Sequence, residues 1–275
     1  MKQLSVGGNV YEIVDATARS GVGTNATNIA NAQAVLDAIA ADGAGAHNSI
    51  YRGKYLGSSV TTEQWAAIGD GSFRDLFIGD YWTIDGINYR IAAFDYYYRT
   101  GETECTTHHA TLVPDTNMYT HYMNSENVTT GAYPNSAMYA SGLDQAKTTI
   151  KAAFGESHLL VHDQYFPNAV SNGYTSGGAW YTGQSVNLMT EQNVYGCKVF
   201  GNCINGTNWP YSYTIDKSQY PLFALNPYMI SNRQWYWLRD VASSTYFAYV
   251  TTSGNCGSYA ASAALGVRPA FSIKS

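Results

Sequence analysis

The chain has few charged side chains, and this scarcity limits what it can bind. Only 13% of its 275 residues are Asp, Glu, Lys or Arg, which is about half of the ~25% found in an ordinary soluble domain. Its 15 basic and 20 acidic residues give a net charge of −5, so the sequence offers no positive surface for a phosphate backbone. We therefore expect no nucleic-acid partner.

Long apolar stretches and a recognisable export signal are missing as well. The purely apolar runs resemble Ile91–Phe94 in length, far short of the ~20 residues that span a bilayer. The N-terminus, MKQLSVGGNVYEIVDATAR, has no apolar block followed by a small-residue cleavage site, unlike a secretory signal. We expect synthesis in a cytoplasm and no membrane partner.

Cysteine is scarce and widely spaced. Cys105, Cys197, Cys203 and Cys256 include no C-x-x-C pair, whereas a structural zinc site needs about four ligands at close spacing. The segment CKVFGNC allows either a disulfide between Cys197 and Cys203 or two thiols, and the absence of an export signal favours thiols. We expect neither a metal nor a cofactor.

The usual catalytic motifs are absent too. There is no G-x-S-x-G, H-E-x-x-H, Walker loop or G-x-G-x-x-G after a strand. The pair His108-His109 is the first candidate for a ligand set, but neighbouring residues on a strand point to opposite faces. One ring hydrogen-bonded in the core is the favoured interpretation, and the sequence predicts no catalytic residues.

What the sequence does contain is divided into two parts. Residues 1–50 hold one of the 24 Tyr and many small residues. Within them, Asn28–Ala41 is expected to form a helix, because Ile29, Ala32, Leu36 and Ile39 follow a 3-4-3 spacing typical of coiled coils. This stripe fits a helix lying on its own domain or a homo-oligomeric stalk, and residues 42–46 are expected to form a flexible link.

From Tyr51 to Ser275 the pattern changes to short strands, few helices and long polar connections, which predicts the α+β class. Asp85-Gly86 predicts a hairpin turn. The expected helices are Thr61–Ile68, with Thr62 as the N-cap, and Leu143–Phe154. The expected strands are Tyr51–Leu56, Tyr81–Ile84, Asn88–Phe94, Thr111–Pro114, Ser185–Thr190, Tyr195–Phe200, Trp235–Val241, Phe247–Thr251 and Val267–Ile273.

The last forty residues alternate apolar anchors with neutral polar residues and tyrosines. Tyr gives a large, stiff, amphipathic contact, and Ser, Thr and Asn give adaptable hydrogen bonds, as in antibody paratopes. The segment is therefore a candidate recognition surface. The predicted ligand-binding residues are Tyr236, Ser243, Ser244, Thr245, Tyr246, Tyr249, Thr251, Ser253, Asn255, Ser258 and Tyr259.

Three motifs in this segment carry a resemblance. YWLRDV (Tyr236–Val241), FAYV (Phe247–Val250) and GVRPAF (Gly266–Phe271) resemble the closing segment of C-type-lectin-like domains related in fold to formylglycine-generating enzyme. The subgroup that they resemble most is a family found in gut bacteria and their phages. YRGKYLG, FIGDYWTIDGINYRIAAFDY and HHATLVPDT extend the likeness over roughly residues 51–275. The N-terminal VGGNVYEIVDATAR resembles the opening of tail and baseplate proteins of phages that infect Gram-positive hosts.

This resemblance implies a C-type-lectin-like domain over residues 51–275, preceded by a short helical segment for virion attachment and oligomerisation. Some lectin-like relatives are variable products of diversity-generating retroelements, in which adenine-directed mutagenesis rewrites codons for Tyr, Ser, Asn and Cys. Cys256 fits such a position. The positions that match the scaffold are Trp237, Arg239, Phe247, Gly266, Arg268, Pro269 and Phe271.

The catalytic and calcium-binding sides of that superfamily do not carry over. None of the four cysteines matches the active-site pair of formylglycine-generating enzymes, and the E-P-N or Q-P-D loop of calcium-dependent lectins is missing. The resemblance therefore implies a non-enzymatic virion protein that binds a host surface protein or glycan and contacts other virion proteins, as a homo-oligomer for which we favour a trimer. The alternatives are a structural decoration or assembly protein of the virion and, third, a metal-dependent oxidase or hydrolase on the same fold.

Overall fold

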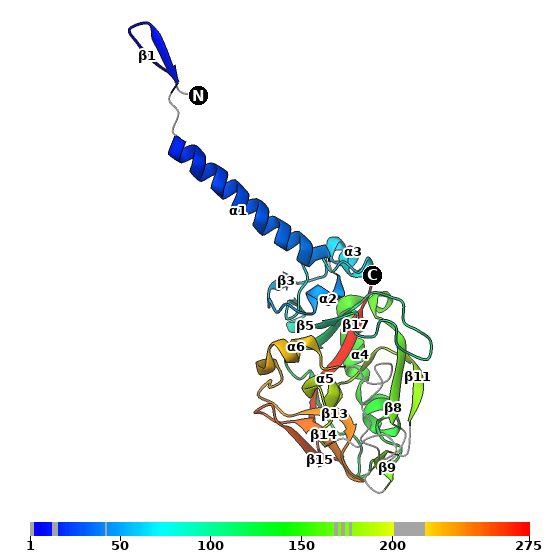
Figure 1. Cartoon of the computed structure of the whole chain (residues 1–275). Coiled ribbons are helices and arrows are strands. Elements are labelled where there is room, and N and C mark those ends of the chain that lie inside the picture. Colours follow the sequence, from blue (N-terminus) through cyan, green and yellow to red (C-terminus); the bar gives the residue numbers. More distant parts are fainter. Residues whose placement is uncertain are drawn as a thin grey trace.

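The computed structural model describes the chain except residues 1–2, 13–15, 42, 168–169, 172–173, 176–177 and 201–217. Two antiparallel-rich sheets form the centre of a body from which one long helix extends (Figure 1). The larger sheet has the order β12 (Val186–Leu188), β17 (Pro269–Ile273), β6 (Ala110–Pro114), β5 (Ile87–Phe94), β4 (Tyr81–Ile84) and β3 (Tyr55–Gly57).

The second sheet is built mostly from the C-terminal strands. Its order is β15 (Cys256–Ala260), β14 (Tyr246–Val250), β13 (Tyr236–Val241), β16 (Leu265–Val267) and β7 (Tyr119–His121). Neighbouring strands in both sheets are antiparallel except β3 with β4 and β13 with β16. The other strands of the described residues form three two-stranded sheets: β1 (Gln3–Val6) with β2 (Asn9–Glu12), β8 (His162–Pro167) with β11 (Gly178–Gln184), and β9 (Val170–Ser171) with β10 (Tyr174–Thr175).

Helices are short apart from the first one. The α-helices are α1 (Ala16–Ala41), α2 (Ala44–His47), α3 (Thr62–Gly69), α4 (Asp144–Phe154), α5 (Glu191–Tyr195) and α6 (Pro221–Leu225). Single turns of 3₁₀ or π type occur at η1 (Tyr133–Asn135), η2 (Met138–Gly142), η3 (Glu156–His158) and η4 (Pro227–Met229). The predicted α+β class is confirmed. No described helix combines the length and the apolar character needed to cross a membrane.

The two sheets share one core, and the five-stranded sheet is buried on its other face too. Tyr236 and Val250 of the five-stranded sheet join Trp82 and Ile91 of the six-stranded sheet in one cluster. The opposite face of β13 and β14 packs against residues 123–143 in a second cluster that includes Trp237. Since both faces of these central strands are largely covered, the exposed side chains of this sheet lie on its edge strand β15, in the hairpin turns and at the strand ends.

Most of the expected elements exist, with shifted ends. The hairpin turn is confirmed, because Asp85 and Gly86 have φ of 50° and 77°, as a type I′ turn requires. Helix α4 buries Ala146, Ile150 and Phe154 on one face and ends at Gly155. The N-cap of α3 is Thr61 rather than Thr62: its hydroxyl accepts the Gln64 N–H at 3.3 Å, and the Gln64 side chain accepts the Thr61 N–H at 2.9 Å.

The strand expected at Tyr195–Phe200 is wrong. Of these residues only Tyr195 lies in a regular element, as the last residue of α5, which is capped by Thr190 and ends at Gly196 in the left-handed conformation; residues 196–200 form neither strand nor helix. The helix is favoured because the Thr190 hydroxyl accepts the Asn193 N–H while the Asn193 side chain accepts the Thr190 N–H. The residues after Gly196 then turn back over α5.

The N-terminal helix is longer than expected. The prediction of a flexible link at residues 42–46 is wrong for the residues that the structure describes. Helix α1 begins at Ala16, twelve residues before Asn28. Residues 44–47 form α2, whose His47 is fully buried and bonds through Nδ1 to the Leu76 carbonyl at 2.5 Å. Asp42 lies outside the described residues. The body therefore includes residues before the expected domain boundary at 50.

Candidate functional site: an aromatic patch on the C-terminal hairpins

The predicted ligand-binding residues lie on two successive hairpins and do not form one surface. Ser243, Ser244 and Thr245 occupy the turn between β13 and β14, whereas Thr251, Ser253 and Asn255 occupy the turn between β14 and β15. The five residues of β14 separate these turns by about 17 Å. A compact ligand can therefore contact one group or the other.

Many hydroxyls in these turns already have a structural role. The Ser243 hydroxyl accepts the backbone N–H of Thr245 at 3.2 Å and of Tyr246 at 3.1 Å. In the other turn, the Thr251 hydroxyl accepts the Asn255 N–H at 3.0 Å. These are local side-chain-to-backbone bonds of the kind that stabilise turns, so they explain Ser and Thr here without a ligand.

Strand pairing places the exposed tyrosines on opposite faces of the sheet. Tyr246 pairs with Ala260, and its neighbour Phe247 pairs with Tyr259. Because side chains alternate along a strand, Tyr246 and Tyr259 point to different sides, although both are about 40% exposed (42% and 40%). Ser258 pairs with Ala248 and lies on the side opposite Tyr259.

Tyr236 is a core residue, which corrects its assignment to the ligand-binding surface. Its side chain is fully buried, its hydroxyl donates to the Ile230 carbonyl at 2.8 Å, and its ring lies 5.1 Å from the Arg268 guanidinium carbon. Burial raises the pKa of this phenol, and Arg268 opposes the shift. The alternation that leaves Trp235 exposed turns the next residue inward.

The nearly buried Tyr249 and two exposed rings form what we call the aromatic patch: Trp235, Tyr249 and Tyr259. The ring centroids are 5.2 Å apart for Trp235 and Tyr249, 5.6 Å for Trp235 and Tyr259, and 5.8 Å for Tyr249 and Tyr259. Trp235 and Tyr259 are 39% and 40% exposed, whereas Tyr249 is 8% exposed and lies 6.4 Å from the buried ring of Trp237. Burial raises the pKa of Tyr249, with smaller contributions from Tyr259 and Cys256.

The backbone under the patch is held closely. The Trp235 carbonyl accepts the Gly266 N–H at 3.0 Å and the Asn117 side-chain amide at 3.0 Å. A Cβ at Gly257 would lie 2.6 Å from the Tyr249 ring, so glycine leaves room for that ring. Rigid aromatic groups on a fixed backbone lose little entropy on binding. Trp235 was not among the predicted site residues; the signal for it was its position two residues before the buried Trp237.

The predicted scaffold residues are buried or pack beneath the hairpins. The Trp237 indole N–H donates to the His121 carbonyl at 2.9 Å. Arg268 is fully buried and donates through Nε to the Pro114 carbonyl at 2.8 Å. The remaining members, Arg239, Phe247, Gly266, Pro269 and Phe271, are buried except for Arg239, which is half-buried over the Phe166 ring.

The histidine pair has the expected structural role for one ring. His109 is fully buried; its Nδ1 lies 2.9 Å from the Thr107 carbonyl and its Nε2 accepts the Tyr97 N–H at 2.9 Å. His108 is partly exposed and lies 2.7 Å from the Asp95 carboxylate. Within the described residues, no three His, Cys, Asp or Glu side chains meet in a way that could hold a metal ion. Cys105, Cys197 and Cys256 are free thiols, and Cys203 lies outside the described residues.

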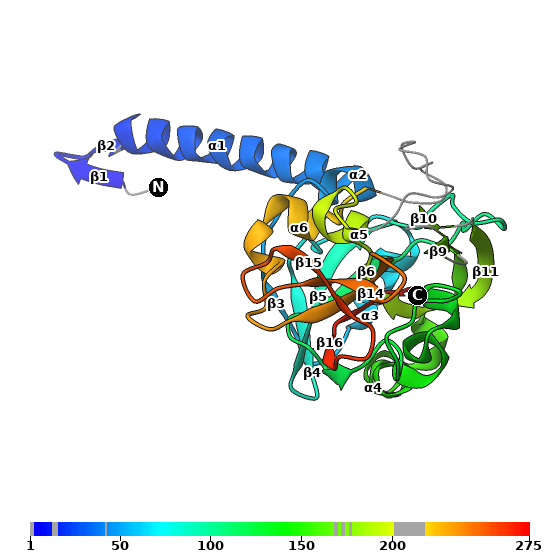
Figure 2. The ribbon, with the colours of Figure 1, turned by 90° about the horizontal axis from the view of Figure 1, so that it is seen from below.

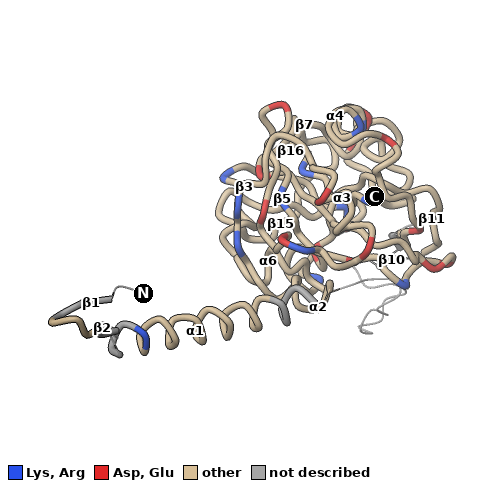
Figure 3. The backbone as a smooth tube through the Cα atoms, turned by 90° about the horizontal axis from the view of Figure 1, so that it is seen from above, with Lys and Arg blue, Asp and Glu red and all other residues tan. Residues whose placement is uncertain are grey.

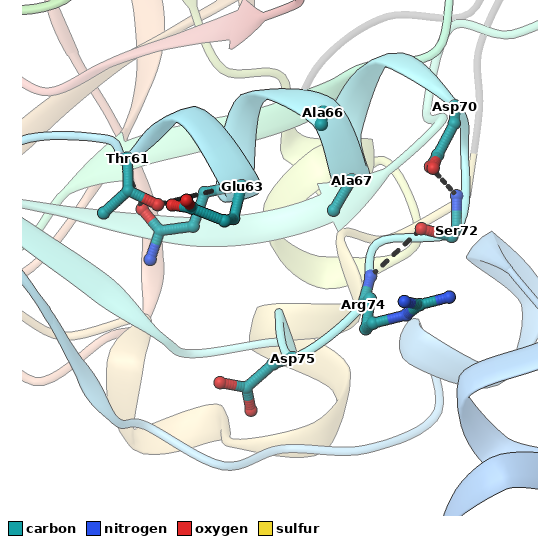
Figure 4. A pocket seen from close by; sticks show the side chains of 9 residues that line it. Thr61, Glu63, Ala66, Ala67, Asp70, Ser72, Arg74 and Asp75 are labelled. Atoms are coloured by element: carbon teal, nitrogen blue, oxygen red, sulfur yellow. Dashed lines mark hydrogen bonds between the residues drawn. The ribbon is translucent and has the colours of Figure 1, made fainter.

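A groove of about 510 Å³ lies far from the patch in sequence, along α3 and the turn after it (Figure 4). Its lining residues are Thr61, Glu63, Gln64, Ala66, Ala67, Asp70, Ser72, Arg74 and Asp75. Asp70 accepts the Ser72 N–H at 2.8 Å, and Asp75 pairs with Arg52 and Lys54. These two carboxylates therefore hold the turn and the neighbouring cations.

Comparison with known proteins adds a family likeness without a function. Residues 163–275 match a family model described as a domain of unknown function (DUF6273). The search of curated proteins and the search of solved structures gave no match. The matched segment contains the whole aromatic patch, yet its strands β12 and β17 complete a sheet whose other strands precede it. The match therefore covers part of one folded body.

Proposed function

We propose that the protein is a non-enzymatic virion adhesin that binds a host surface protein or glycan through the aromatic patch. The exposure of Trp235 and Tyr259 beside the nearly buried Tyr249 is the observation that carries this proposal. Large aromatic side chains that remain in solvent on a rigid support are typical of recognition surfaces.

The surroundings of the patch suit a neutral ligand. Charged residues are sparse over the body, as Figure 3 shows, and the C-terminal strands carry few of them. Binding would therefore depend on ring contacts and hydrogen bonds, with little electrostatic steering. Affinity for such a ligand should change little with salt.

The fold assignment and the diversification that we propose follow from the resemblance. A C-type-lectin-like domain is compatible with the α+β architecture, and the closing motifs YWLRDV, FAYV and GVRPAF coincide with β13, β14 and the β16–β17 segment. We propose retroelement diversification only for solvent-facing positions such as Tyr246, Ser253, Asn255 and Tyr259. A template repeat and a reverse-transcriptase gene beside the encoding gene would support this part; a neighbourhood with neither would refute it.

The N-terminal segment is proposed to attach the protein to the virion and to hold three copies together. Val22, Ile29 and Leu36 recur every seven residues along α1 and are 69%, 69% and 58% exposed. Three copies of one patch would strengthen weak single-site binding through avidity. The role in the virion itself rests on the resemblance of VGGNVYEIVDATAR to phage tail proteins.

Binding to whole cells tests the adhesin proposal. Fluorescently labelled protein is incubated with a panel of Gram-positive gut bacteria, and the bound fraction is measured by flow cytometry. We expect at least one strain to bind the wild type and the variant with both Trp235→Ala and Tyr259→Ala to lose at least tenfold in affinity. Tyr228→Ala is the matched control, because Tyr228 is 91% exposed but lies on η4 outside the patch.

Two outcomes would contradict the proposal. One is equal binding by the wild type and the double variant, provided that both unfold at the same temperature. The other is a map of the whole virion in which neighbouring subunits cover the patch, which would favour a structural decoration protein.

A further inference from the structure

A buried lysine and a buried aspartate meet beside α5, away from the exposed rings. Lys198 Nζ lies 3.0 Å from Asp240 Oδ1, and their side chains are only 9% and 3% exposed. Asp240 comes from β13, and Lys198 from the turn that follows α5. A nucleophilic amine and a carboxyl group are thus held in contact with little access for water.

A second acid stands next to this pair. Glu191, the first residue of α5, is fully buried. Its carboxylate accepts the backbone N–H groups of Val199 at 2.9 Å and Phe200 at 2.8 Å, and the Cys256 thiol donates to it at 3.1 Å. Burial first, and then the negative charge of Asp240, raise the pKa of Glu191.

The backbone of Glu191 also contacts the Asp240 carboxyl group. The Glu191 N–H donates to Asp240 Oδ2 at 2.6 Å, at the N-terminal turn of α5. This donor faces the oxygen that would carry negative charge if an amine added to Asp240 Cγ. Preorganised N–H donors of this kind stabilise oxyanions.

The charged form of this cluster is costly. Moving an ammonium group and a carboxylate out of water carries a desolvation penalty that their attraction does not always offset, and here a second carboxyl group adds repulsion. A neutral amide between the same atoms would remove both charges. Because the two groups are held in contact, their reaction needs no bimolecular encounter. This raises the rate by several orders of magnitude.

We propose that Lys198 and Asp240 form an intramolecular isopeptide bond. Lys198 Nζ adds to Cγ of Asp240, forming the C–N bond; one C–O bond of the carboxyl group then breaks, and its oxygen leaves as one water molecule with two protons that came from the ammonium group. The neighbouring Glu191 carboxyl group relays the proton during this transfer. The reaction is a condensation, so it consumes no oxidant or reductant.

The product would join the turn after α5 to the central strand β13 covalently. It does not depend on the adhesin role, because it concerns residues away from the aromatic patch. If no bond forms, Lys198 and Asp240 are a buried ion pair. The mass of the protein distinguishes the bonded from the unbonded state.

The decisive measurement is the intact mass of the purified, reduced and unfolded protein. We expect it to be lower than the sequence mass by one water. Tryptic digestion should then leave Lys198 uncleaved and yield one peptide pair joined through Lys198 and Asp240, identified by fragmentation. A wild-type protein with the full sequence mass overturns the proposal, and this readout needs no variant to fold.

Three variants assign the loss of water to the right atoms. Lys198→Arg keeps the positive charge but has no amine that can form the bond, so it should have its full mass. Asp240→Asn should lose ammonia in place of water. Glu191→Gln should slow bond formation by about 100-fold or more. The rate is measured on protein that is made in unfolded form and then refolded, by following the loss of water in its mass with time. Loss of water that persists in Lys198→Arg, for example through a succinimide at Asp85-Gly86, would overturn the assignment.

Discussion

Tyrosine has two different roles in this chain, and burial separates them. Tyr89, Tyr133, Tyr220 and Tyr236 are among the largest fully buried side chains, whereas Tyr259 remains in solvent. A phenol suits both places, since its ring is apolar and its hydroxyl can donate a hydrogen bond, as that of Tyr236 does to the Ile230 carbonyl; the buried Tyr89 hydroxyl has no partner among the described residues. The count of 24 Tyr could therefore suggest a contact surface but could not say which residues form it.

His162 is a residue for which burial predicts a pH effect. The centroid of its ring lies 3.9 Å from that of the Tyr97 ring, and its Nε2 lies 3.0 Å from the Gln164 side-chain amide. Its buried Nδ1 has no hydrogen-bond partner among the described residues. Burial, with help from the charges of His109 and Arg239, lowers the pKa of His162 from 6.5 to about 3. The folded state therefore holds this ring neutral in mildly acidic solution.

The sign of the effect follows from proton binding. Below pH 6.5 the unfolded chain protonates this histidine and the folded chain does not, so stability falls as pH decreases towards about 3. We expect a loss on the order of 3 kcal/mol between neutral pH and about pH 4 from this group. Urea unfolding at several pH values measures it. In His162→Gln the slope over this range should become flatter; an unchanged slope would show that other groups cause it.

Gly266 contacts the backbone of Trp235, so a larger side chain there should destabilise the fold by a steric clash. A Cβ there would lie 1.8 Å from Asn117 Nδ2 and 2.6 Å from the Trp235 carbonyl oxygen. The amide can move, but the backbone oxygen cannot, so we expect Gly266→Ala to lower the free energy of unfolding by about 1–3 kcal/mol. The control is Gly45→Ala in α2, where nothing lies within 4 Å of the new Cβ. Similar midpoints in urea for both variants would contradict the steric argument.

At the scale of elements, the sequence predicted the turns and helix faces that depend on residues close together in the chain. The Asp85-Gly86 turn and the face of α4 follow from residue type and spacing alone. The start of α1 was missed because Gly21, Gly23 and the threonines have low helix propensity. In the structure, the Thr24 and Thr27 hydroxyls bond back to carbonyls four residues earlier at 3.0 and 3.1 Å, which satisfies them inside the helix.

The candidate site shows a different limit. The segment was identified from its composition, but strand pairing decides that Tyr246 and Tyr259 face opposite sides and that Tyr236 enters the core. A shift of one residue in register would exchange every one of these assignments. Such register depends on contacts with β16 and β15, which the sequence of one strand does not contain. The patch therefore became visible only with Trp235 beside its cross-strand neighbours.

The N-cap of α3 provides a test at the same scale. Thr61 and Thr62 are adjacent and chemically identical, but only Thr61 makes the reciprocal bonds with Gln64. We expect Thr61→Ala to lower the free energy of unfolding by about 1 kcal/mol, because it leaves the Gln64 N–H without its acceptor. Thr62→Ala should change it by less than about 0.5 kcal/mol. Urea denaturation of both variants decides, and equal losses would contradict the assigned cap.

At the scale of the whole molecule, the body and α1 differ in how they are stabilised. The sheets of the body share a core to which both halves of the chain contribute. Helix α1 extends away from that body in two views (Figures 1 and 2), and its side chains are exposed at every position from 19 to 36. A helix of 26 residues with several Gly, Thr and Asn is marginal in water without packing. Its stability therefore calls for a partner.

Other copies of α1 are the partner that its sequence fits. Val22, Ile29 and Leu36 share one heptad position, and Ala32 and Ile39 fit the second. The charged residues of α1 are Arg19 and Asp37, both outside this stripe, so like helices can approach with little repulsion. We expect the wild type to have three times the chain mass by light scattering after size exclusion, and Ile29→Asp with Leu36→Asp to be a monomer. Asn31→Asp, on the opposite face, should stay trimeric. Since Val22, Ile29 and Leu36 are exposed and take no part in the core, the body should unfold at the same urea concentration in all three proteins. A monomeric wild type would remove the coiled-coil assignment.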